Sequence, residues 1–334
     1  MLTERLSTDM SQSVKKITGL VAATFTPLSE DGEINLSVIA PYIDYLVDKQ
    51  GVKCVFVNGT TGEGCSLTVD ERKQLAAAWC HHGKGKLEQV IVHVGCLSLK
   101  DSQELAHHAA SIGANGISVI SPSYFKPMNA DALRLFIKEV SASAPGLPMY
   151  YYHLPGLTGV TLEAADVLDG IEKVIPSFQG VKYSGMDLRD LGQCVSYSQP
   201  RNWSVLYGVD EQLLAALVLG VDGAVGRWPA VIDVLNVTEA TVPHYTYNYL
   251  GRMVKQIISA FDNGNHSQAR TLQFKFMEII TFARSLGFDV SVNKQVMSEV
   301  SGLPLGPPRL PLLPCLVSKA QAIAQKIRDF SQGH

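Results

Sequence analysis

The chain has 334 residues, of which 46% are hydrophobic and 18% are charged. This balance is typical of a folded protein with a sizeable core and excludes an intrinsically disordered chain. The formal net charge is −3 and no run of like charges stands out, so we expect neither a nucleic-acid-binding face nor a polybasic membrane patch. No apolar run reaches the ~20 residues that span a bilayer, so we expect no membrane association.

Six cysteines are spread along the chain without a Cys-x-x-Cys pair: Cys54, Cys65, Cys80, Cys96, Cys194 and Cys315. Scattered thiols of this kind are typical of a reducing compartment rather than of a disulfide-bonded secreted protein. Residues 1–16 are polar and contain no apolar segment of a secretory signal. We therefore expect a cytoplasmic protein.

Short apolar runs alternate with longer amphipathic segments along the chain. The runs rich in Val and Ile cover residues 19–28, 52–60, 89–95, 116–122, 148–155, 178–184, 203–210 and 222–226. Segments with helical spacing cover residues 35–50, 68–83, 98–113, 129–144, 161–170, 187–198 and 211–220. Gly51 ends the first of these segments, and Thr68 with Glu71 forms a capping box that opens the second.

These eight strand runs, alternating with helical segments, predict an α/β protein with a (β/α)8 TIM-barrel fold. Near-continuous apolar runs are expected of parallel strands that are covered on both faces. A doubly wound open sheet is the alternative. It requires a Gly-rich phosphate loop after the first strand, and the sequence "TFTPLSEDG" at 24–32 does not contain one.

Two segments are additional to the eight strands and the helices that a simple (β/α)8 barrel contains. Helical patterns at 266–287, 290–302 and 316–330 follow one another without a strand, and the proline-rich stretch 303–314 connects the last two. We therefore expect a single domain, 1–334, made of a barrel at 19–264 and a packed helical extension at 265–334. Residues 227–245 form an unusual insertion after the eighth strand, where such loops usually take ~2–6 residues.

In barrel enzymes the active site lies at the carboxyl ends of the strands. Lys182 ends the sixth strand. A lysine in apolar surroundings loses solvation, which lowers its pKa from ~10.4 and yields a neutral amine that attacks ketones to form a Schiff base. The alternative is a structural ion pair with Asp210 or Glu211, which follow the seventh strand and also suit the start of a helix.

Further polar groups stand at the same predicted rim. Thr60 and Thr61 follow the second strand in "NGTTGEG", where hydroxyls and loop amides can hold a carboxylate. The alternative is an ordinary Gly-rich turn between a strand and a helix, without a binding role. Tyr124 follows the fourth strand, and Tyr152 and His153 lie at the end of the fifth. A tyrosine at such a position serves in packing or in catalysis. No His-x-His, His-Glu-x-x-His or Cys/His cluster is present, so we expect neither a metal nor another cofactor.

The motifs "GTTGEG", "YYYHLPGLTG" and "GVKYSG" together resemble the N-acetylneuraminate lyase and dihydrodipicolinate synthase superfamily, whose members are Schiff-base barrels. The likeness runs from Gly19 to the C-terminal helices, includes "GPPRLPL", and is greatest to the animal N-acetylneuraminate lyases. It implies an aldolase-type lyase of sialic acid catabolism that reversibly cleaves N-acetylneuraminate to N-acetylmannosamine and pyruvate. It also implies a homotetramer.

The resemblance assigns roles to the residues at the strand ends. Lys182 matches the lysine that forms the Schiff base, and Tyr152 matches the tyrosine that shuttles protons at the reacting carbon. Thr60 and Thr61 match the hydroxyl pair that holds the pyruvate carboxylate. Tyr124 matches a tyrosine that approaches the site of a neighbouring subunit. The positions that hold the sugar's hydroxyl tail are matched by Ser184, Gly208, Asp210 and Glu211.

One residue separates the lyases from the synthases. The synthases resemble "PGRTG" in the fifth loop, where an arginine grips a second carboxylate, whereas this chain has "PGLTG" with Leu157. A neutral side chain suits a sugar aldehyde better than an acidic one. Other keto-acid aldolases of the superfamily remain an alternative.

The insertion is the main departure from the resemblance. The lyases usually continue the eighth strand as "GSTYN", whereas here Arg227 follows Gly226 and "TYN" comes only at 246–248. Residues 227–245 therefore replace a serine at the expected rim. The second hypothesis is a non-catalytic or impaired homologue that keeps ligand binding or assembly.

Overall fold

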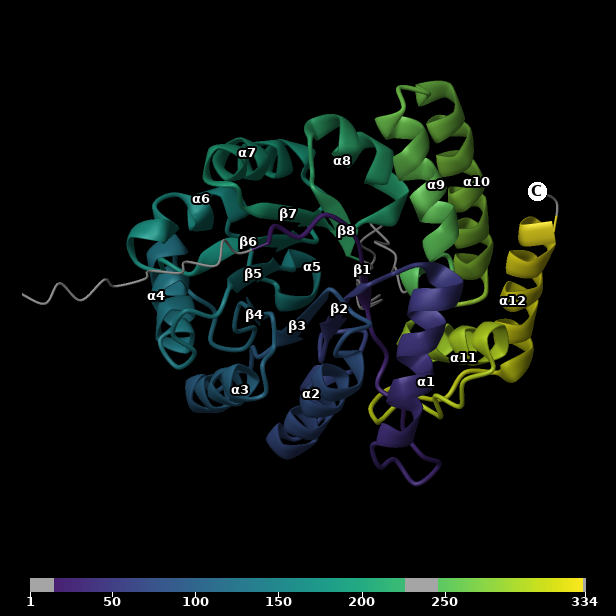
Figure 1. The fold of residues 1–334 in the computed structure, drawn as a ribbon, viewed down its shortest axis with the longest axis horizontal. Coiled ribbons are helices and arrows are strands. Elements are labelled where there is room, and N and C mark those ends of the chain that lie inside the picture. The colour runs from purple at the N-terminus through teal and green to yellow at the C-terminus, as the bar shows by residue number, and fades with distance from the viewer. Residues whose placement is uncertain (1–14, 226–245, 333–334) are drawn as a thin grey trace, which may run out of the picture.

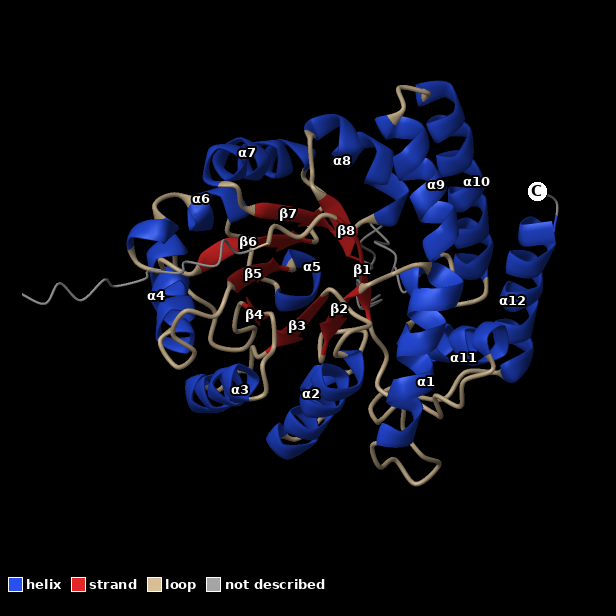
Figure 2. Ribbon diagram, viewed as in Figure 1, coloured by secondary structure: helices blue, strands red, loops and turns tan. Residues whose placement is uncertain are grey.

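The computed structural model describes residues 15–225 and 246–332. Its eight parallel strands pair in chain order and close into a barrel, which confirms the predicted fold (Figure 2). The strands are β1 (Gly19–Ala23), β2 (Cys54–Val57), β3 (Gln89–His93), β4 (Gly116–Ile120), β5 (Met149–His153), β6 (Phe178–Tyr183), β7 (Ser204–Tyr207) and β8 (Gly223–Val225). β8 closes the barrel by pairing with β1, with Leu20 opposite Ala224.

Helices surround the strands in Figure 1. Those of the ring are α1 (Ile39–Asp44), α2 (Val69–Gly83), α3 (Leu99–Ser111), α4 (Ala130–Ser141), α6 (Ala164–Leu168), α7 (Leu188–Ser198), α8 (Leu213–Leu219) and α9 (Gly251–Asp262). The predicted capping box is present, because the Thr68 hydroxyl accepts from the Glu71 amide while the Glu71 carboxylate accepts from the Thr68 amide. It opens α2 at the predicted residue.

The predicted helix at 35–50 is divided into three turns of different winding. A 3-10 turn at Leu36–Val38 leads into α1, which continues as a π-helical turn at Tyr45–Gln50. Gly51 ends this segment in the left-handed conformation, with φ of 65°. Glycine adopts this conformation without strain, and the helical segment ends at Gly51 as predicted.

Two helices lie outside the predicted segments. α5 (Pro155–Thr158) directly follows β5 and begins at a proline, whose missing amide costs nothing at the first helical position. Leu157 of α5 packs against the side chains inside the barrel, and Figure 1 shows α5 within the ring of strands. α5 therefore helps to cover the barrel mouth. The other helix, α9, follows β8 and completes the ring of helices around the barrel.

The C-terminal region forms α10 (His266–Ser285), α11 (Val290–Ser301) and α12 (Val317–Gln332), close to the predicted segments. α10 packs against α9 and α12 packs against α11. In Figure 1 these helices stand together beside the barrel, on the side of α1 and α9. The proline-rich connector between α11 and α12 contains no helix or strand, as predicted.

Two apolar layers hold the barrel together. The larger lies between the strands and the helices, and the smaller fills the barrel interior with residues such as Val21, Phe56 and Tyr152. Side chains alternate between the two faces of a strand, so Tyr152 and Lys182 share the interior while Tyr151 and Tyr183 face the helices. Tyr152 and Lys182 are register partners on β5 and β6.

The insertion 227–245 lies outside the described residues. After this segment the described chain resumes with the 3-10 turn η7 (Thr246–Asn248). A side chain of η7 is hydrogen-bonded to the barrel. The Asn248 amide donates to the Ala23 carbonyl at 2.9 Å, and the Tyr42 hydroxyl donates to the Asn248 side-chain oxygen at 2.6 Å. η7 is thereby fixed at the carboxyl end of β1.

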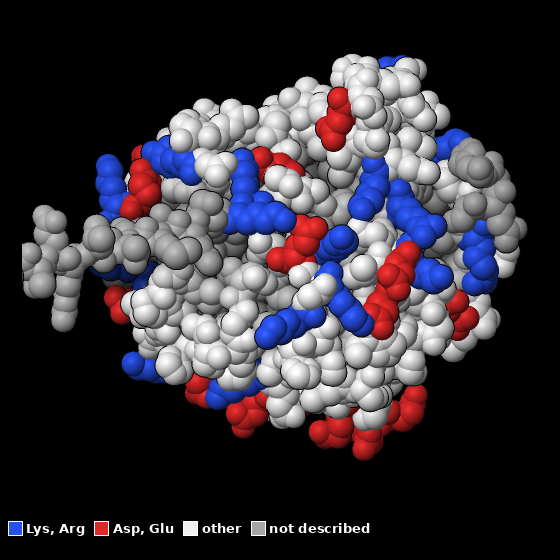
Figure 3. Space-filling view, in the orientation of Figure 1, with Lys and Arg blue, Asp and Glu red and all other residues white. Residues whose placement is uncertain are grey.

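The face seen in Figure 3 carries both basic and acidic side chains across its area. This agrees with the small net charge of the chain. In the described part of the chain, no helix is long and apolar enough to cross a membrane.

Candidate active site

Lys182 lies at the carboxyl end of β6 with its side chain inside the barrel. Only 2% of the residue is exposed. Its Nζ lies 3.8 Å from the centroid of the Phe56 ring and 4.1 Å from that of Tyr152. Aromatic faces attract a cation, so both rings hold the amine in place. A buried lysine amine at the carboxyl end of a barrel strand can serve as a nucleophile.

Tyr152 connects this lysine to the loop after β2. The residue is fully buried, and its hydroxyl lies 3.3 Å from the Thr60 hydroxyl. The Phe56 ring meets the Tyr152 ring edge to face, with the centroids 5.5 Å apart. Phe56 thus fixes the positions of both Lys182 and Tyr152. The structure brings together Lys182, Tyr152 and Thr60, as the sequence predicts for one rim.

The loop at 58–66 carries the two predicted threonines in a tight turn. Thr60 is half-buried and Thr61 is buried. The Gly64 amide donates to the Gly59 carbonyl at 3.0 Å, and a Cβ on Gly64 would lie 2.0 Å from the Asn58 carbonyl oxygen. Position 64 therefore admits only glycine, which keeps the loop folded closely over the end of β2.

His93 was not among the predicted site residues. It ends β3, is buried, and its ring stands at 90° to the Tyr152 ring with the centroids 5.8 Å apart. Its Nδ1 lies 3.1 Å from the Asn58 carbonyl oxygen, to which it donates. Burial, with Arg72 and Lys182 nearby, holds the pKa of His93 well below its ordinary value. His93 could have been found by the signal that identified Lys182, namely a polar residue at the end of an apolar run.

Arg72 is a buried arginine on α2 that braces the end of β3. One guanidinium nitrogen donates to the His93 carbonyl at 2.7 Å, and the other donates to the Gly95 carbonyl at 3.1 Å. Both carbonyls belong to the turn that leaves β3. Arg72 therefore fixes the backbone that carries His93, from outside the barrel.

The predicted sugar-tail residues lie at the ends of β6 and β7. Ser184 is fully buried, and its hydroxyl has no hydrogen-bond partner among the described residues. The Gly208 amide donates to the Tyr183 carbonyl at 2.8 Å. Asp210 is buried and accepts a hydrogen bond from the Thr246 hydroxyl. The buried Ser184 hydroxyl is the clearest ligand-binding signal among them, since such groups are normally paired.

Glu211 also follows β7, and its carboxylate lies 3.3 Å from an Arg284 guanidinium nitrogen on α10.

Tyr124 lies away from the other predicted site residues. It is 77% exposed and its ring contacts the Phe125 ring, with the centroids 5.0 Å apart. Within this chain, Tyr124 therefore lies at the surface rather than among the buried residues around Lys182.

A pocket of about 310 Å³ lies at the carboxyl ends of β2 to β5. Thr60 lines it, and its walls are mostly apolar, with Leu154 and Leu157 from the loop and helix after β5. Leu157 is half-buried there, at the position where the resemblance places an arginine in the synthases. The pocket therefore has room for a small organic substrate beside the threonine loop.

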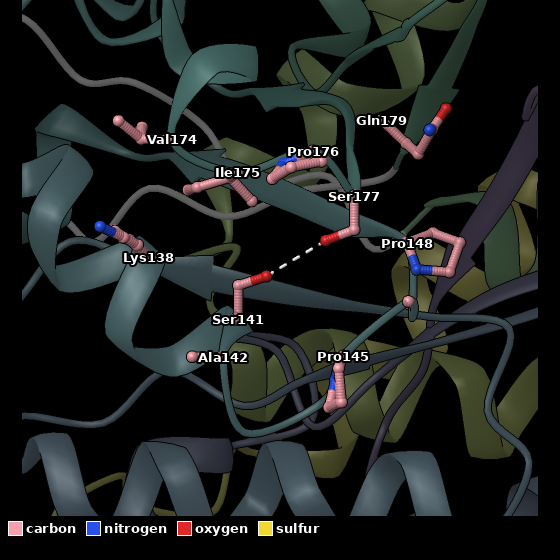
Figure 4. A pocket seen from close by; sticks show the side chains of 11 residues that line it. Lys138, Ser141, Ala142, Pro145, Pro148, Val174, Ile175, Pro176, Ser177 and Gln179 are labelled. Atoms are coloured by element: carbon pink, nitrogen blue, oxygen red, sulfur yellow. Dashed lines mark hydrogen bonds between the residues drawn. The ribbon is translucent and has the colours of Figure 1, made fainter.

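A second hollow, of about 520 Å³, opens at the opposite end of the barrel. Figure 4 shows the hydrogen bond that crosses it between the Ser141 and Ser177 hydroxyls, 3.2 Å long. Three prolines line it, and Lys138 is the charged residue on its rim. Pro148 and Ser177 immediately precede β5 and β6, so this hollow lies at the amino ends of the strands, away from Lys182.

The family model for the dihydrodipicolinate synthetase family matches residues 16–329. The chain belongs to the dihydrodipicolinate synthetase family. Within the family, it is 79% identical to the N-acetylneuraminate lyase of Danio rerio over 324 residues, which cover 97% of this chain and 100% of that protein.

Solved structures of the family superpose closely on the chain. The N-acetylneuraminate lyase (sialic acid aldolase) of Aliivibrio salmonicida is 33% identical, with a TM-score of 0.83 over 94% of this chain and 97% of that one. A catalytic-lysine mutant of the sialic acid aldolase of Ruminococcus gnavus is 28% identical, with a TM-score of 0.82 over 95% of this chain and 97% of that one. The fold is therefore shared with both of these aldolases over almost the whole chain.

Proposed function

We propose that this chain is a lyase that reversibly cleaves N-acetylneuraminate to N-acetylmannosamine and pyruvate through a Schiff base on Lys182. The observation that carries the proposal is the buried Lys182 amine, packed on the Tyr152 ring whose hydroxyl meets Thr60. The names of the relatives support the substrate, and the aldolase of Ruminococcus gnavus has a catalytic lysine by its description.

The chemistry follows from these positions. The neutral Lys182 amine adds to the C2 keto carbon of the open-chain sugar acid, and water leaves to form an iminium. The iminium accepts the electron pair of the C3–C4 bond as that bond breaks, which leaves an enamine. Tyr152 gives its phenol proton to the hydroxyl that leaves as water. The phenolate then takes the proton of the C4 hydroxyl as the aldehyde forms, returns it to C3, and is reprotonated on hydrolysis. Water then releases pyruvate and restores the amine.

The other rim residues hold the two ends of the substrate. Thr60, Thr61 and their loop amides bind the carboxylate next to C2. Ser184, Gly208, Asp210 and Glu211 bind the hydroxyl tail, and the unpartnered Ser184 hydroxyl is available for this. Leu157 presents no cation to a second carboxylate, which favours a neutral aldehyde product.

The proposal is tested by following pyruvate release from N-acetylneuraminate and, in parallel, from other 2-keto-3-deoxy sugar acids. We expect the highest kcat/KM with N-acetylneuraminate. A higher value with a different keto acid would replace the substrate while keeping the aldolase chemistry. No turnover of any keto acid by the folded protein would favour the impaired homologue.

We also propose that the chain forms one domain and a cytoplasmic homotetramer, with Tyr124 near the site of a neighbouring subunit. The exposed Tyr124 and Phe125 side chains, at 77% and 86%, suit an interface because large exposed aromatic side chains are enriched there. Light scattering coupled to size exclusion measures the mass of the assembly. A monomer at micromolar concentration would refute both the tetramer and the cross-subunit role.

A further inference from the structure

We propose that the buried ion pair between Glu63 and Lys294 is a positioning device that shapes the substrate-carboxylate loop at Thr60 and Thr61. The inference rests on the proposed function. It makes the C-terminal helices part of the active-site support, since Lys294 belongs to α11, outside the barrel. The pair acts through the loop, since the Glu63 amide donates to the Thr60 carbonyl.

The pair is built to hold one carboxylate in one orientation. Both side chains are 0% exposed, and Lys294 Nζ lies 2.9 Å from Glu63 Oε1. The other oxygen, Oε2, accepts from the Arg309 backbone amide at 2.7 Å. Lys294 also donates to the Pro307 carbonyl at 2.8 Å. Residues of α11 and of the connector thus hold both ends of the pair.

Glu63 has an unfavourable backbone conformation for its residue type. Its φ is 55°, one of three positive values among the non-glycine residues that the structure describes. The others are at Asn58 and Asn202, and asparagine tolerates this region better than glutamate does. Such a conformation persists only where the surroundings hold it, and it tends to occur at functional sites. Lys294 and the Arg309 amide are the groups that hold Glu63.

The backbone of Glu63 sets the shape of the threonine turn. Its amide donates to the Thr60 carbonyl at 3.0 Å, and its carbonyl accepts from the Ser66 amide at 2.7 Å. On the other side, the Thr26 hydroxyl donates to the Gly62 carbonyl at 2.6 Å. A change in the Glu63 conformation therefore moves Thr60, whose hydroxyl lies 3.3 Å from that of Tyr152.

Stability alone does not account for this pair. A buried ion pair loses so much solvation that well-packed neutral side chains are often as stable or more stable. Burial lowers the pKa of Lys294 for the same reason, although Glu63 opposes the shift. What the pair supplies instead is a fixed direction for the Glu63 carboxylate and, through it, for the loop.

The test uses a double variant, Glu63→Gln with Lys294→Met, which removes both charges without leaving one buried alone. The readouts are the melting temperature, KM and kcat, and the pyruvate concentration that gives half-maximal borohydride trapping on Lys182. The control is Lys326→Gln, which breaks an exposed ion pair of 2.6 Å with Glu278 in the same C-terminal helices. Wild-type trapping is measured first, because its absence refutes the proposed function independently of this inference.

We expect the double variant to melt near the wild-type temperature while its half-saturating pyruvate concentration rises by between about tenfold and a hundredfold. kcat should change by less than about threefold, since the loop binds ground state and transition state alike. Lys326→Gln should match the wild type in every readout. A half-saturating concentration within about twofold of wild type in the double variant would overturn the inference.

Glu63→Gly, made together with Lys294→Met so that no charge is left buried alone, provides an independent arm if the first double variant does not fold. Glycine adopts a positive φ freely, so the backbone conformation is allowed while the carboxylate is lost. We expect weaker pyruvate binding here too, because the loop is no longer anchored to α11. Wild-type pyruvate binding by this second double variant would show that backbone conformation suffices and that the ion pair does not position the loop.

Discussion

Lys182 and Tyr152 are register partners on neighbouring strands, and the Lys182 Nζ lies 4.1 Å from the centroid of the Tyr152 ring. Because paired residues of adjacent parallel strands project to the same face, the two side chains share the barrel interior. The nucleophile and the proton shuttle of the proposed reaction are therefore placed together by sheet register rather than by a flexible loop. This explains how two residues thirty positions apart act on one carbon.

Tyr152→Phe should separate Schiff-base formation from proton transfer. Phenylalanine keeps the ring under Lys182 and against Phe56, but it removes the hydroxyl beside Thr60. We expect kcat for N-acetylneuraminate to fall by about 10²- to 10⁴-fold, the usual range for general acid–base catalysis, while pyruvate is still trapped on Lys182. Steady-state kinetics and borohydride trapping measure the two steps.

The matched control is Tyr150→Phe, which removes a hydroxyl from the interior side of the same strand. Tyr150 is buried among the interior apolar residues and has no proposed role in the reaction. Its variant should keep kcat. If both variants lose activity equally, the effect comes from packing of β5 and not from proton transfer.

Leu157→Arg should change the preferred aldehyde. The new guanidinium would enter an apolar pocket beside the threonine loop and would attract a second carboxylate. We expect kcat/KM for N-acetylneuraminate to fall by at least about tenfold, because an unpaired buried charge is costly. Leu157→Gln controls for polarity without charge. Equal losses in the two variants would mean that shape, not charge, sets the preference.

The Arg309–Glu71 ion pair should make stability depend on acid pH. Hydrogen bonds from Arg309, above all, lower the pKa of Glu71 to about 2. Since the unfolded value is ~4.3, the pair stabilises the fold above that pH, and this contribution disappears as the pH falls towards about 2. Arg309→Gln should therefore reduce the free energy of unfolding at pH 7, and the difference from wild type should shrink below pH ~4.

Urea unfolding at several pH values between about 7 and 3 measures this difference. A difference that stays constant down to the lowest pH would contradict the linkage to Glu71. In that case the hydrogen bonds of Arg309 to the Ser66 and Gly32 carbonyls would account for its whole effect.

Replacing residues 227–245 by a single serine should raise lyase activity. The resemblance to the lyases implies Ser-Thr-Tyr-Asn directly after the glycine, and residues 227–245 stand where that serine is expected. We expect kcat/KM to rise by about tenfold, the effect of one well-placed hydrogen bond. Replacement by alanine separates removal of the segment from the gain of a hydroxyl. Equal or lower turnover in the serine variant would contradict the prediction that residues 227–245 lower the activity.

Much of the barrel could be predicted from local patterns. Parallel strands covered on both faces are continuously apolar, so the eight Val- and Ile-rich runs marked them, and the Thr68–Glu71 box marked the start of α2. A polar residue at the end of such a run, as at Lys182, stood out for the same reason. α9 escaped prediction because it follows the insertion, which interrupts the regular spacing.

Pairings between distant residues could not be predicted in this way. Glu63 and Lys294 are 231 positions apart and meet only because α11 packs on the barrel. Arg72 is buried although its helix is rich in polar residues, because its guanidinium reaches the end of β3. The sequence does not distinguish Phe56 from the other apolar residues of its strand, because its ring meets Lys182 only in the closed barrel. These contacts depend on the tertiary structure, which the local sequence does not encode by itself.

The most direct test of the account is to incubate the protein with pyruvate and borohydride and to locate the adduct by peptide mass spectrometry. Reduction fixes a Schiff base as a stable secondary amine, so the account predicts one pyruvate-derived adduct per chain, on Lys182, and none in Lys182→Ala. No adduct on the folded wild-type protein, or an adduct that persists in Lys182→Ala, would contradict it.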